Sequence, residues 1–138
     1  MAKATGSQVR LQHAQHNEAT CDHLGKTDDF LDWVVTTAFY SALHYVEHRL
    51  FPRTEKVKGA VVKYETFEDW YKAVGYNNKH SELRQLVQYS CPGYVSSSYR
   101  ALLDSSYTAR YRHYATSRPL ADKARKDLEN VKAYCTAA

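Results

Sequence analysis

The spacing of hydrophobic and polar residues indicates a chain built almost entirely of helices. Residues 7–24 contain no Gly or Pro, and Gly25 follows them as a natural helix stop. A thin apolar stripe recurs at helical spacing within this run, at Leu11, Ala14, Cys21 and Leu24. We therefore expect a first helix over residues 7–24 with one face against the core.

The clearest helical pattern spans residues 30–51, which reach Pro52 without a breaker, and Asp28 or Asp29 is placed to cap its start. A helix that is non-polar on two sides is usually buried on both. We therefore expect this helix to be the central and most buried one, with its second side against another helix or another subunit. Its first side comprises Leu31, Val35, Ala38, Ala42, Val46 and Leu50, and its second side Trp33, Thr37, Tyr40, His44 and His48.

The rest of the chain predicts one irregular connection and three further helices. Residues 52–76 form the connection, with a short helix that begins at Thr66 and ends near Gly75, and an extended piece within residues 58–64. A third helix over residues 79–90 is capped by Asn77 or Asn78. The fourth begins at Ser96 or Ser97 and continues through Tyr114, and the fifth begins around Ser117-Arg118-Pro119. The pattern predicts an all-α antiparallel bundle of about five helices, in a single domain over residues 1–138.

Composition adds limits on the class of protein. Twelve Tyr against 5 Gly and 3 Pro favour long helices over a turn-rich β fold. The net charge of +4 permits a polyanionic partner without demanding one. The three cysteines are odd in number and form no CxxC pair, which favours a reducing compartment over a disulfide framework. The sequence has neither a signal-like N-terminus nor an apolar run of about 18 residues, so we expect a cytoplasmic protein with no membrane segment.

The motifs of several common enzyme classes are missing from the sequence. It has no Gly-rich phosphate loop, HExxH, GxSxG or CxxC pattern, and we expect no cofactor. His13, His16 and His23 share one face of the first helix, and imidazoles one turn apart bind a divalent metal when a carboxylate completes the site. Glu18 and Asp22 point elsewhere on that helix. We therefore interpret the histidines as a solvated or contact face and predict no metal site.

Arg110 is the first candidate functional residue. It shares a helical stripe with Tyr99, Ser106 and Tyr114, so we expect its guanidinium to face inward and to be largely buried. A buried arginine needs a partner. That partner is either a carboxylate, such as Asp32 or Glu82, together with a stacked tyrosine, or the phosphate of a ligand, whose oxygens suit the planar guanidinium. The sequence favours neither alternative.

Two further pairs have competing interpretations. His80 and Arg84 lie one turn apart on the third helix, where a neutral imidazole can act as general base and an arginine can stabilise a pentavalent phosphate. A structural polar network is the simpler explanation. Tyr40 and His44, on the second side of the central helix, either stack on unpaired bases or form a helix–helix interface, and the interface is the commoner use of such a stripe.

Four segments resemble the HEPN family. DWVVTTAFYSALHYVEHRL resembles the family's helix in which an aromatic pair and a small residue precede a histidine, here Phe39-Tyr40-Ser41-Ala42-Leu43-His44. HNEATCDHL, NKHSELR and LLDSSYTARYRHY follow in the order seen in HEPN-like proteins, and the last places Arg110-Tyr111 in the family's Arg-Tyr positions. The resemblance covers most of residues 10–135 apart from the 52–76 loop.

This resemblance implies a four- to five-helix bundle, commonly a homodimer, from prokaryotic conflict systems such as toxin–antitoxin, CRISPR and anti-phage loci. Active members carry Arg-x4–6-His on one helix, and two copies meet across the dimer to form a metal-independent ribonuclease site. Many members lack this motif and serve as RNA-binding or assembly modules. In this chain Arg110, at the family's Arg-Tyr positions, is followed by His113 at Arg-x2-His spacing, which is not the spacing of the active members.

We therefore expect a HEPN-like, RNA-associated domain. One interpretation is a divergent metal-independent endoribonuclease, and the alternative is a non-catalytic interaction module of a defence or toxin–antitoxin complex. The expected partners are a second copy of the chain, RNA or a nucleotide, and a protein from the same operon. The predicted catalytic residues are His80, Arg84, Arg110 and His113, and the predicted RNA- or nucleotide-binding residues are Tyr40, His44, Arg110, Tyr111 and Tyr114.

Overall fold

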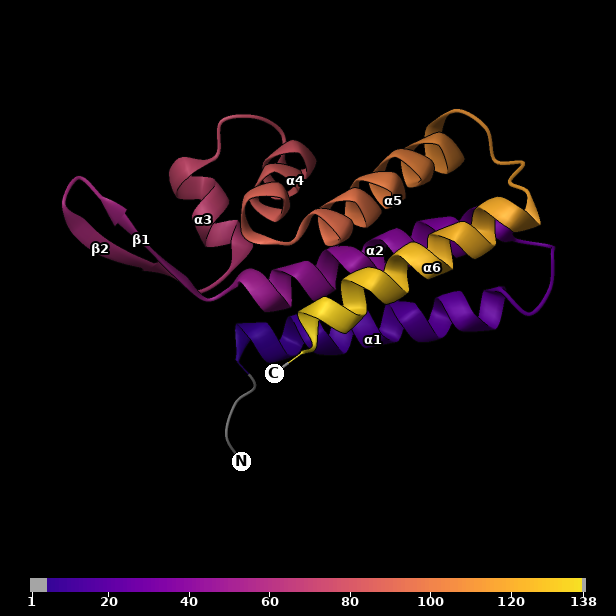
Figure 1. Cartoon of the computed structure of the whole chain (residues 1–138), viewed down its shortest axis with the longest axis horizontal. Coiled ribbons are helices and arrows are strands. Elements are labelled where there is room, and N and C mark those ends of the chain that lie inside the picture. The colour runs from indigo at the N-terminus through magenta and orange to yellow at the C-terminus, as the bar shows by residue number, and fades with distance from the viewer. Residues whose placement is uncertain (1–4, 138) are drawn as a thin grey trace.

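The structure, a computed structural model, describes residues 5–137 and contains within them six helices and one two-stranded sheet. The elements are α1 (Gly6–Leu24), α2 (Leu31–Leu50), β1 (Arg53–Val57), β2 (Ala60–Tyr64), α3 (Phe67–Val74), α4 (Lys79–Ser90), α5 (Gly93–Tyr111) and α6 (Arg118–Cys135). The long helices α1, α2, α5 and α6 lie alongside one another, and the β-hairpin extends from one end of the bundle (Figure 1).

Helix α2 is the centre of the bundle. It packs against α1, α5 and α6, and 13 of its 20 residues are buried. On its second side His44 is only 9% exposed and Thr37, Tyr40 and His48 are half-buried, whereas Trp33 at the N-terminal end is 54% exposed. The prediction that this helix is the most buried element is confirmed.

Small and polar residues connect α1 to its neighbours. Ala14 is fully buried, and its carbonyl oxygen accepts a hydrogen bond from the Ser41 hydroxyl of α2 at 2.8 Å. The carboxylate of Glu18 accepts bonds from Tyr45 of α2 at 2.6 Å and from Lys132 of α6 at 2.8 Å. A single side chain on α1 therefore joins three helices of the bundle.

The mainly helical class is confirmed, and the six helices are the five expected ones together with α3, the short helix expected within residues 52–76. The six helices are accompanied by an antiparallel hairpin of β1 and β2. The extended piece expected within residues 58–64 is β2. Its partner β1 was not predicted, because its sequence RTEKV is mostly charged and polar and does not show the hydrophobic pattern of a strand. Lys58 and Gly59, with φ of 51° and 85°, form the two-residue turn that suits the twist of a hairpin. Among the described residues no helix is both long enough and apolar enough to cross a membrane.

The prediction that Asp28 or Asp29 caps the start of α2 is wrong. The helix begins after Phe30, which makes no side-chain capping bond. Asp28 instead accepts a hydrogen bond from Arg118 Nε at 2.8 Å, which ties the α1–α2 connection to the start of α6. The caps predicted for α3 and α4 are confirmed, because the side chains of Thr66 and Asn78 accept bonds from the first turns of these helices. Helix α6 begins where it was expected, and Ser117 accepts a bond from the Leu120 N–H in its first turn.

Helix α5 is shifted relative to its predicted bounds. It begins at Gly93, directly after Pro92, and not at Ser96 or Ser97. It ends at Tyr111 because the backbone N–H groups of Arg112 and His113 both turn back to the Thr108 carbonyl, at 3.0 and 2.8 Å. His113 and Tyr114 therefore follow the helix and do not share its face with Arg110.

The burial of α2 gives a direct stability prediction. Phe39 is fully buried in the core, whereas Phe30, at the start of the same helix, is 53% exposed. We expect Phe39→Ala to lower the free energy of unfolding by about 3–5 kcal/mol, because it opens a cavity in a packed core. The control Phe30→Ala removes the same side chain from the surface and is expected to change it by about 0.5 kcal/mol or less. Urea unfolding measures both, and equal losses would contradict the central position of α2.

Candidate functional site

A groove of about 560 Å³ lies beside α4 and α5. We call it the His80–Arg110 groove. Its side chains come from the start of α4 and the last two turns of α5. They include two positively charged residues, two tyrosines and His80, the predicted general base. The lining residues are Asn78, Lys79, His80, Tyr107, Arg110 and Tyr111.

Local bonds at the start of α4 fix the position of His80. The side chain of Asn78 accepts a hydrogen bond from the Ser81 N–H at 2.9 Å and so caps the helix one residue before Lys79. Glu82 accepts bonds from the backbone N–H groups of Tyr76 and Asn77, at 3.1 and 2.8 Å. These bonds hold the pKa of the Glu82 carboxyl below its usual value. The first turn of α4 is therefore anchored on both sides of His80.

Arg110 is held without a carboxylate. Its Nη1 donates to the Tyr40 hydroxyl of α2 at 2.7 Å, and its Nε donates to the Ser106 carbonyl at 3.2 Å. Its Nη2 lies at 3.5 Å from the Ser106 hydroxyl. A guanidinium has five N–H donors, and within residues 5–137 the remaining two have no protein partner.

Aromatic rings complete the surroundings of this guanidinium. Its carbon lies 5.0 Å from the ring centre of Tyr111, 5.3 Å from that of Tyr40 and 5.9 Å from that of Phe39. These cation–π contacts stabilise a positive charge without neutralising it. Arg110 thus keeps its full charge at the wall of an open groove.

Two expectations for Arg110 need correction. The side chain is half-buried and not largely buried. It pairs with neither Asp32 nor Glu82, and no ion pair of Arg110 occurs in the described part of the chain. Glu82 does not pair with Arg110 because its carboxylate already accepts hydrogen bonds from the Tyr76 and Asn77 N–H groups. The expected stacking on tyrosine is present.

His80 is half-buried in the same groove, and its ring meets the ring of Phe39 edge-on at 5.6 Å between centroids. Burial lowers the pKa of His80, and the positive charge of Arg110 lowers it further. Both effects disfavour the imidazolium. The imidazole is therefore neutral at pH 7 and able to accept a proton.

A smaller cavity of about 220 Å³ lies on the other side of His80, which contributes to both. His44 lines this second cavity and stacks on His13 of α1, with ring centroids 3.8 Å apart. The neighbouring Glu47 forms an ion pair with Arg10 at 2.9 Å. His44 therefore belongs to the α1–α2 contact, outside the His80–Arg110 groove.

The structure separates the predicted site residues into two sets. His80, Arg110 and Tyr111 line one groove, and the Tyr40 hydroxyl accepts a hydrogen bond from Arg110. Arg84 is half-buried one turn further along α4 and is not part of the groove lining. His113 and Tyr114 are exposed beyond the end of α5, where His113 lines a separate cavity of about 410 Å³ with Asp104, Thr108 and Leu120.

Three groove residues were missed from the sequence, namely Asn78, Lys79 and Tyr107. The sequence could have indicated Tyr107, because it precedes Arg110 and Tyr111 by one helical turn and shares their face. The sequence indicated Asn78 and Lys79 less clearly, through their position at the helix start that holds His80.

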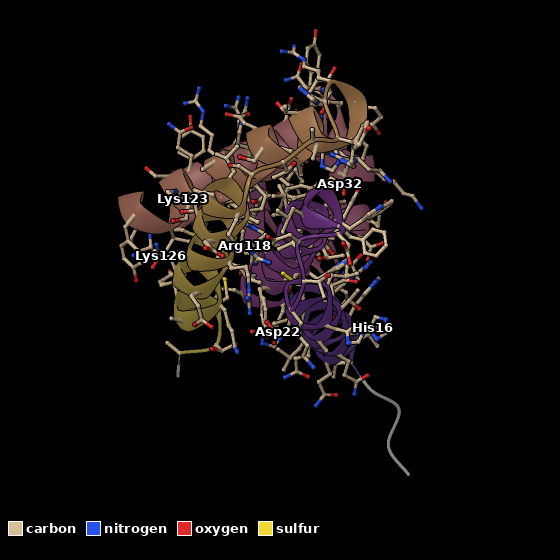
Figure 2. The ribbon with its side chains drawn as sticks, turned by 90° about the vertical axis from the view of Figure 1, so that its right-hand side faces the viewer. His16, Asp22, Asp32, Arg118, Lys123 and Lys126 are labelled. Carbon is tan, nitrogen blue, oxygen red and sulfur yellow. The ribbon has the colours of Figure 1, made fainter. Side chains whose placement is uncertain are left out.

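The histidines of α1 do not assemble with other ligands. His13, His16 and His23 are exposed, and Figure 2 shows His16 on the outer side of the helix. Within residues 5–137 no group of three or more His, Cys, Asp or Glu side chains is arranged to hold a metal ion.

The dependence of His80 on Arg110 can be tested without any ligand. In the wild-type protein we expect the pKa of His80 to lie below 6.5, the ordinary histidine value. Arg110→Gln removes a positive charge that disfavours the imidazolium, so the pKa of His80 should rise while burial keeps it below the ordinary value. Lys79→Gln, which removes a charge from the same groove, is the control and should shift this pKa less. NMR titration of the histidine rings measures both, and an unchanged pKa in Arg110→Gln would contradict the geometry.

Comparisons with protein-family models, with curated proteins and with solved structures found no significant match to this chain.

Proposed function

We propose that this chain is a HEPN-like, RNA-binding domain whose His80–Arg110 groove holds a phosphate and the nucleotides beside it. Arg110 carries this proposal, because it is a half-buried guanidinium with neutral partners only and two unused N–H donors. A positive charge in such a place is costly unless an anion completes its shell. Phosphate matches the planar fork of a guanidinium better than a single point charge does.

Tyrosines favour RNA over free phosphate as the ligand. Tyr107 and Tyr111 are 48% and 67% exposed at the groove, and their rings lie 5.1 Å apart. Exposed aromatic faces beside a basic group are the usual platform for unpaired bases of a single strand. The groove thus offers one site for a phosphate and a second for the bases that adjoin it.

The contact between two family-like segments also supports the proposal. Tyr40 belongs to the segment Phe39-Tyr40-Ser41-Ala42-Leu43-His44, and Arg110 to the Ala109-Arg110-Tyr111 segment. The two are 70 residues apart in sequence and bond to each other at 2.7 Å. The residues that carry the resemblance to the HEPN family therefore meet at the proposed RNA site.

Metal-independent cleavage is the second proposed function, and the neutral imidazole of His80 favours it. His80 would accept the proton of a ribose 2′-hydroxyl, and the 2′-oxygen would attack the adjacent phosphorus. Arg110 would stabilise the charge that develops on the phosphate oxygens. The bond from phosphorus to the 5′-oxygen would break, and the proton held by His80 would pass to that oxygen. The products are a 2′,3′-cyclic phosphate and a 5′-hydroxyl.

An assembly role is the alternative, and exposed hydrophobic side chains favour it. Phe30 and Trp33, at the N-terminal end of α2, and Leu120 on α6 are each more than half exposed. Aromatic side chains such as those of Phe and Trp are enriched in protein–protein interfaces. A symmetric homodimer and a partner protein from a toxin–antitoxin, CRISPR or anti-phage locus remain our proposals for what covers them.

We expect Arg110→Gln to weaken binding of a single-stranded RNA by about 10- to 150-fold, the effect of losing a hydrogen bond to a charged group. The same variant should lower the free energy of unfolding by less than the loss of about 3–5 kcal/mol expected when a buried ion pair is broken, since its partners are a hydroxyl and a carbonyl. Fluorescence anisotropy and thermal melts measure the two effects. Lys126→Gln, on the surface of α6, is the control for charge alone (Figure 2). A large loss of stability with unchanged RNA binding would contradict the proposed function.

Cleavage is tested by incubating the same RNA in the presence of EDTA. The wild-type protein should yield cyclic phosphate ends, and His80→Ala should lose at least about a hundredfold in rate, as expected for a general base. His113→Ala, outside the groove, should keep the wild-type rate. If all three proteins leave the RNA intact while Arg110 still governs binding, the domain binds RNA without cleaving it.

The assembly proposal makes a separate prediction. Light scattering at micromolar concentration should show a dimer, and Trp33→Ser should shift it toward the monomer by removing an aromatic anchor from the interface. Tyr89→Ser, which replaces an aromatic residue that is 88% exposed on α4, is the control. A monomeric wild-type protein would rule out the homodimer.

A further inference from the structure

The β-hairpin carries most of the net charge of the protein. Between Arg53 and Tyr64 it has four basic side chains, Arg53, Lys56, Lys58 and Lys63, and one carboxylate, Glu55, a net charge of +3 against +4 for the whole chain. Figure 1 shows this hairpin extending beyond the helices, away from the bundle. Its charge is therefore presented on a projecting element.

The two faces of the hairpin differ in chemistry. Glu55 is turned toward the body of the protein, where it accepts a bond from the indole N–H of Trp70 at 3.1 Å and pairs with Arg53 at 3.0 Å. Lys56 and Lys63 lie on the opposite face, and both are exposed. Lys63 pairs with Glu65 at 3.2 Å just beyond the strand, but both side chains are mostly in solvent, where such a pair is worth little.

The outer face is basic without being aromatic. The register pairs Thr54 with Lys63 and Lys56 with Val61, and Lys58 follows at the tip. The hairpin's one aromatic residue, Tyr64, is buried. A face that has lysines and no aromatic ring can contact phosphates, but it has no platform on which bases stack.

The root of the hairpin is close to the His80–Arg110 groove. Strand β2 ends at Tyr64, and Phe67 and Glu68 at the start of α3 line the smaller cavity together with His80 and Lys79. His80 and Lys79 in turn line the groove. Strands of five residues are about 17 Å long, so the lysines lie within about that distance of the root of the hairpin.

We infer that the hairpin is an RNA-binding arm, in which Lys56, Lys58 and Lys63 contact the phosphate backbone of an RNA whose nucleotides occupy the groove. This inference rests on the proposed function and adds to it a second, sequence-independent contact. The groove selects unpaired nucleotides, and the arm increases affinity for a longer RNA. Its contribution is electrostatic and therefore depends on salt.

The test compares two double variants that each remove two exposed lysines. Lys56→Gln/Lys58→Gln alters the arm, and Lys26→Gln/Lys126→Gln is the matched control on the helical body. The probes are a short single-stranded RNA and the same RNA extended by a stable stem, each measured at several salt concentrations. We expect the arm variant to lower the slope of log affinity against log salt for the extended RNA by about 1.4–1.8, and the control variant to leave it near the wild-type value. Equal slopes for the two variants would overturn the inference.

Arg110→Gln separates the failure of the arm from the failure of the groove. If Arg110→Gln loses the short RNA and the arm variant keeps the wild-type slope, the groove stands and the arm is refuted. If the arm variant alone loses affinity, the arm stands and the groove proposal fails. Vesicles of anionic phospholipid are the third probe. Loss of vesicle binding in the arm variant with unchanged RNA binding would overturn the inference in favour of a membrane surface.

Discussion

The burial of α2 on both of its sides is the constraint on which the other features depend. A helix with two non-polar sides cannot be covered by one neighbour, so α1, α5 and α6 must all pack against it. This packing brings α5 against the segment of α2 that contains Phe39 and Tyr40. The Tyr40 hydroxyl then meets the guanidinium of Arg110 at 2.7 Å. The proposed site is therefore a consequence of how the core is enclosed.

The electrostatic state of the groove follows from the kind of partners that Arg110 has. A hydroxyl, a carbonyl and aromatic faces stabilise its charge but do not cancel it. A paired carboxylate would have closed the site to anions. Burial lowers the pKa of the His80 imidazole, and the uncancelled charge of Arg110 lowers it further. In the proposed function, Arg110 would bind the phosphate and help burial to keep the neighbouring imidazole unprotonated, two properties that favour phosphate chemistry without a metal.

Charge is distributed unevenly between the body of the protein and the hairpin. In the helical body, several basic side chains are committed to carboxylates, as in the pairs of Arg10 with Glu47 and of Lys132 with Glu18. In the hairpin the one carboxylate faces inward, and the lysines face solvent. Such a division suits a ligand that is held specifically at one point and by its backbone elsewhere.

The sequence by itself determined the mainly helical class, the central position of α2, the caps of α3 and α4 and the candidates His80, Arg110 and Tyr40. These features depend on periodicity and on bonds between residues close in the chain, which a single sequence displays. Only the tertiary structure decided that Asp28 binds Arg118 and leaves the start of α2 uncapped, and that His113 lies outside the site. It also decided that β1 pairs with β2, and that His80 lies in one groove with Arg110 while Glu82 is occupied by backbone N–H groups. Each of these depends on which of several possible partners a polar group meets, and that choice is made by the packing of segments far apart in the sequence.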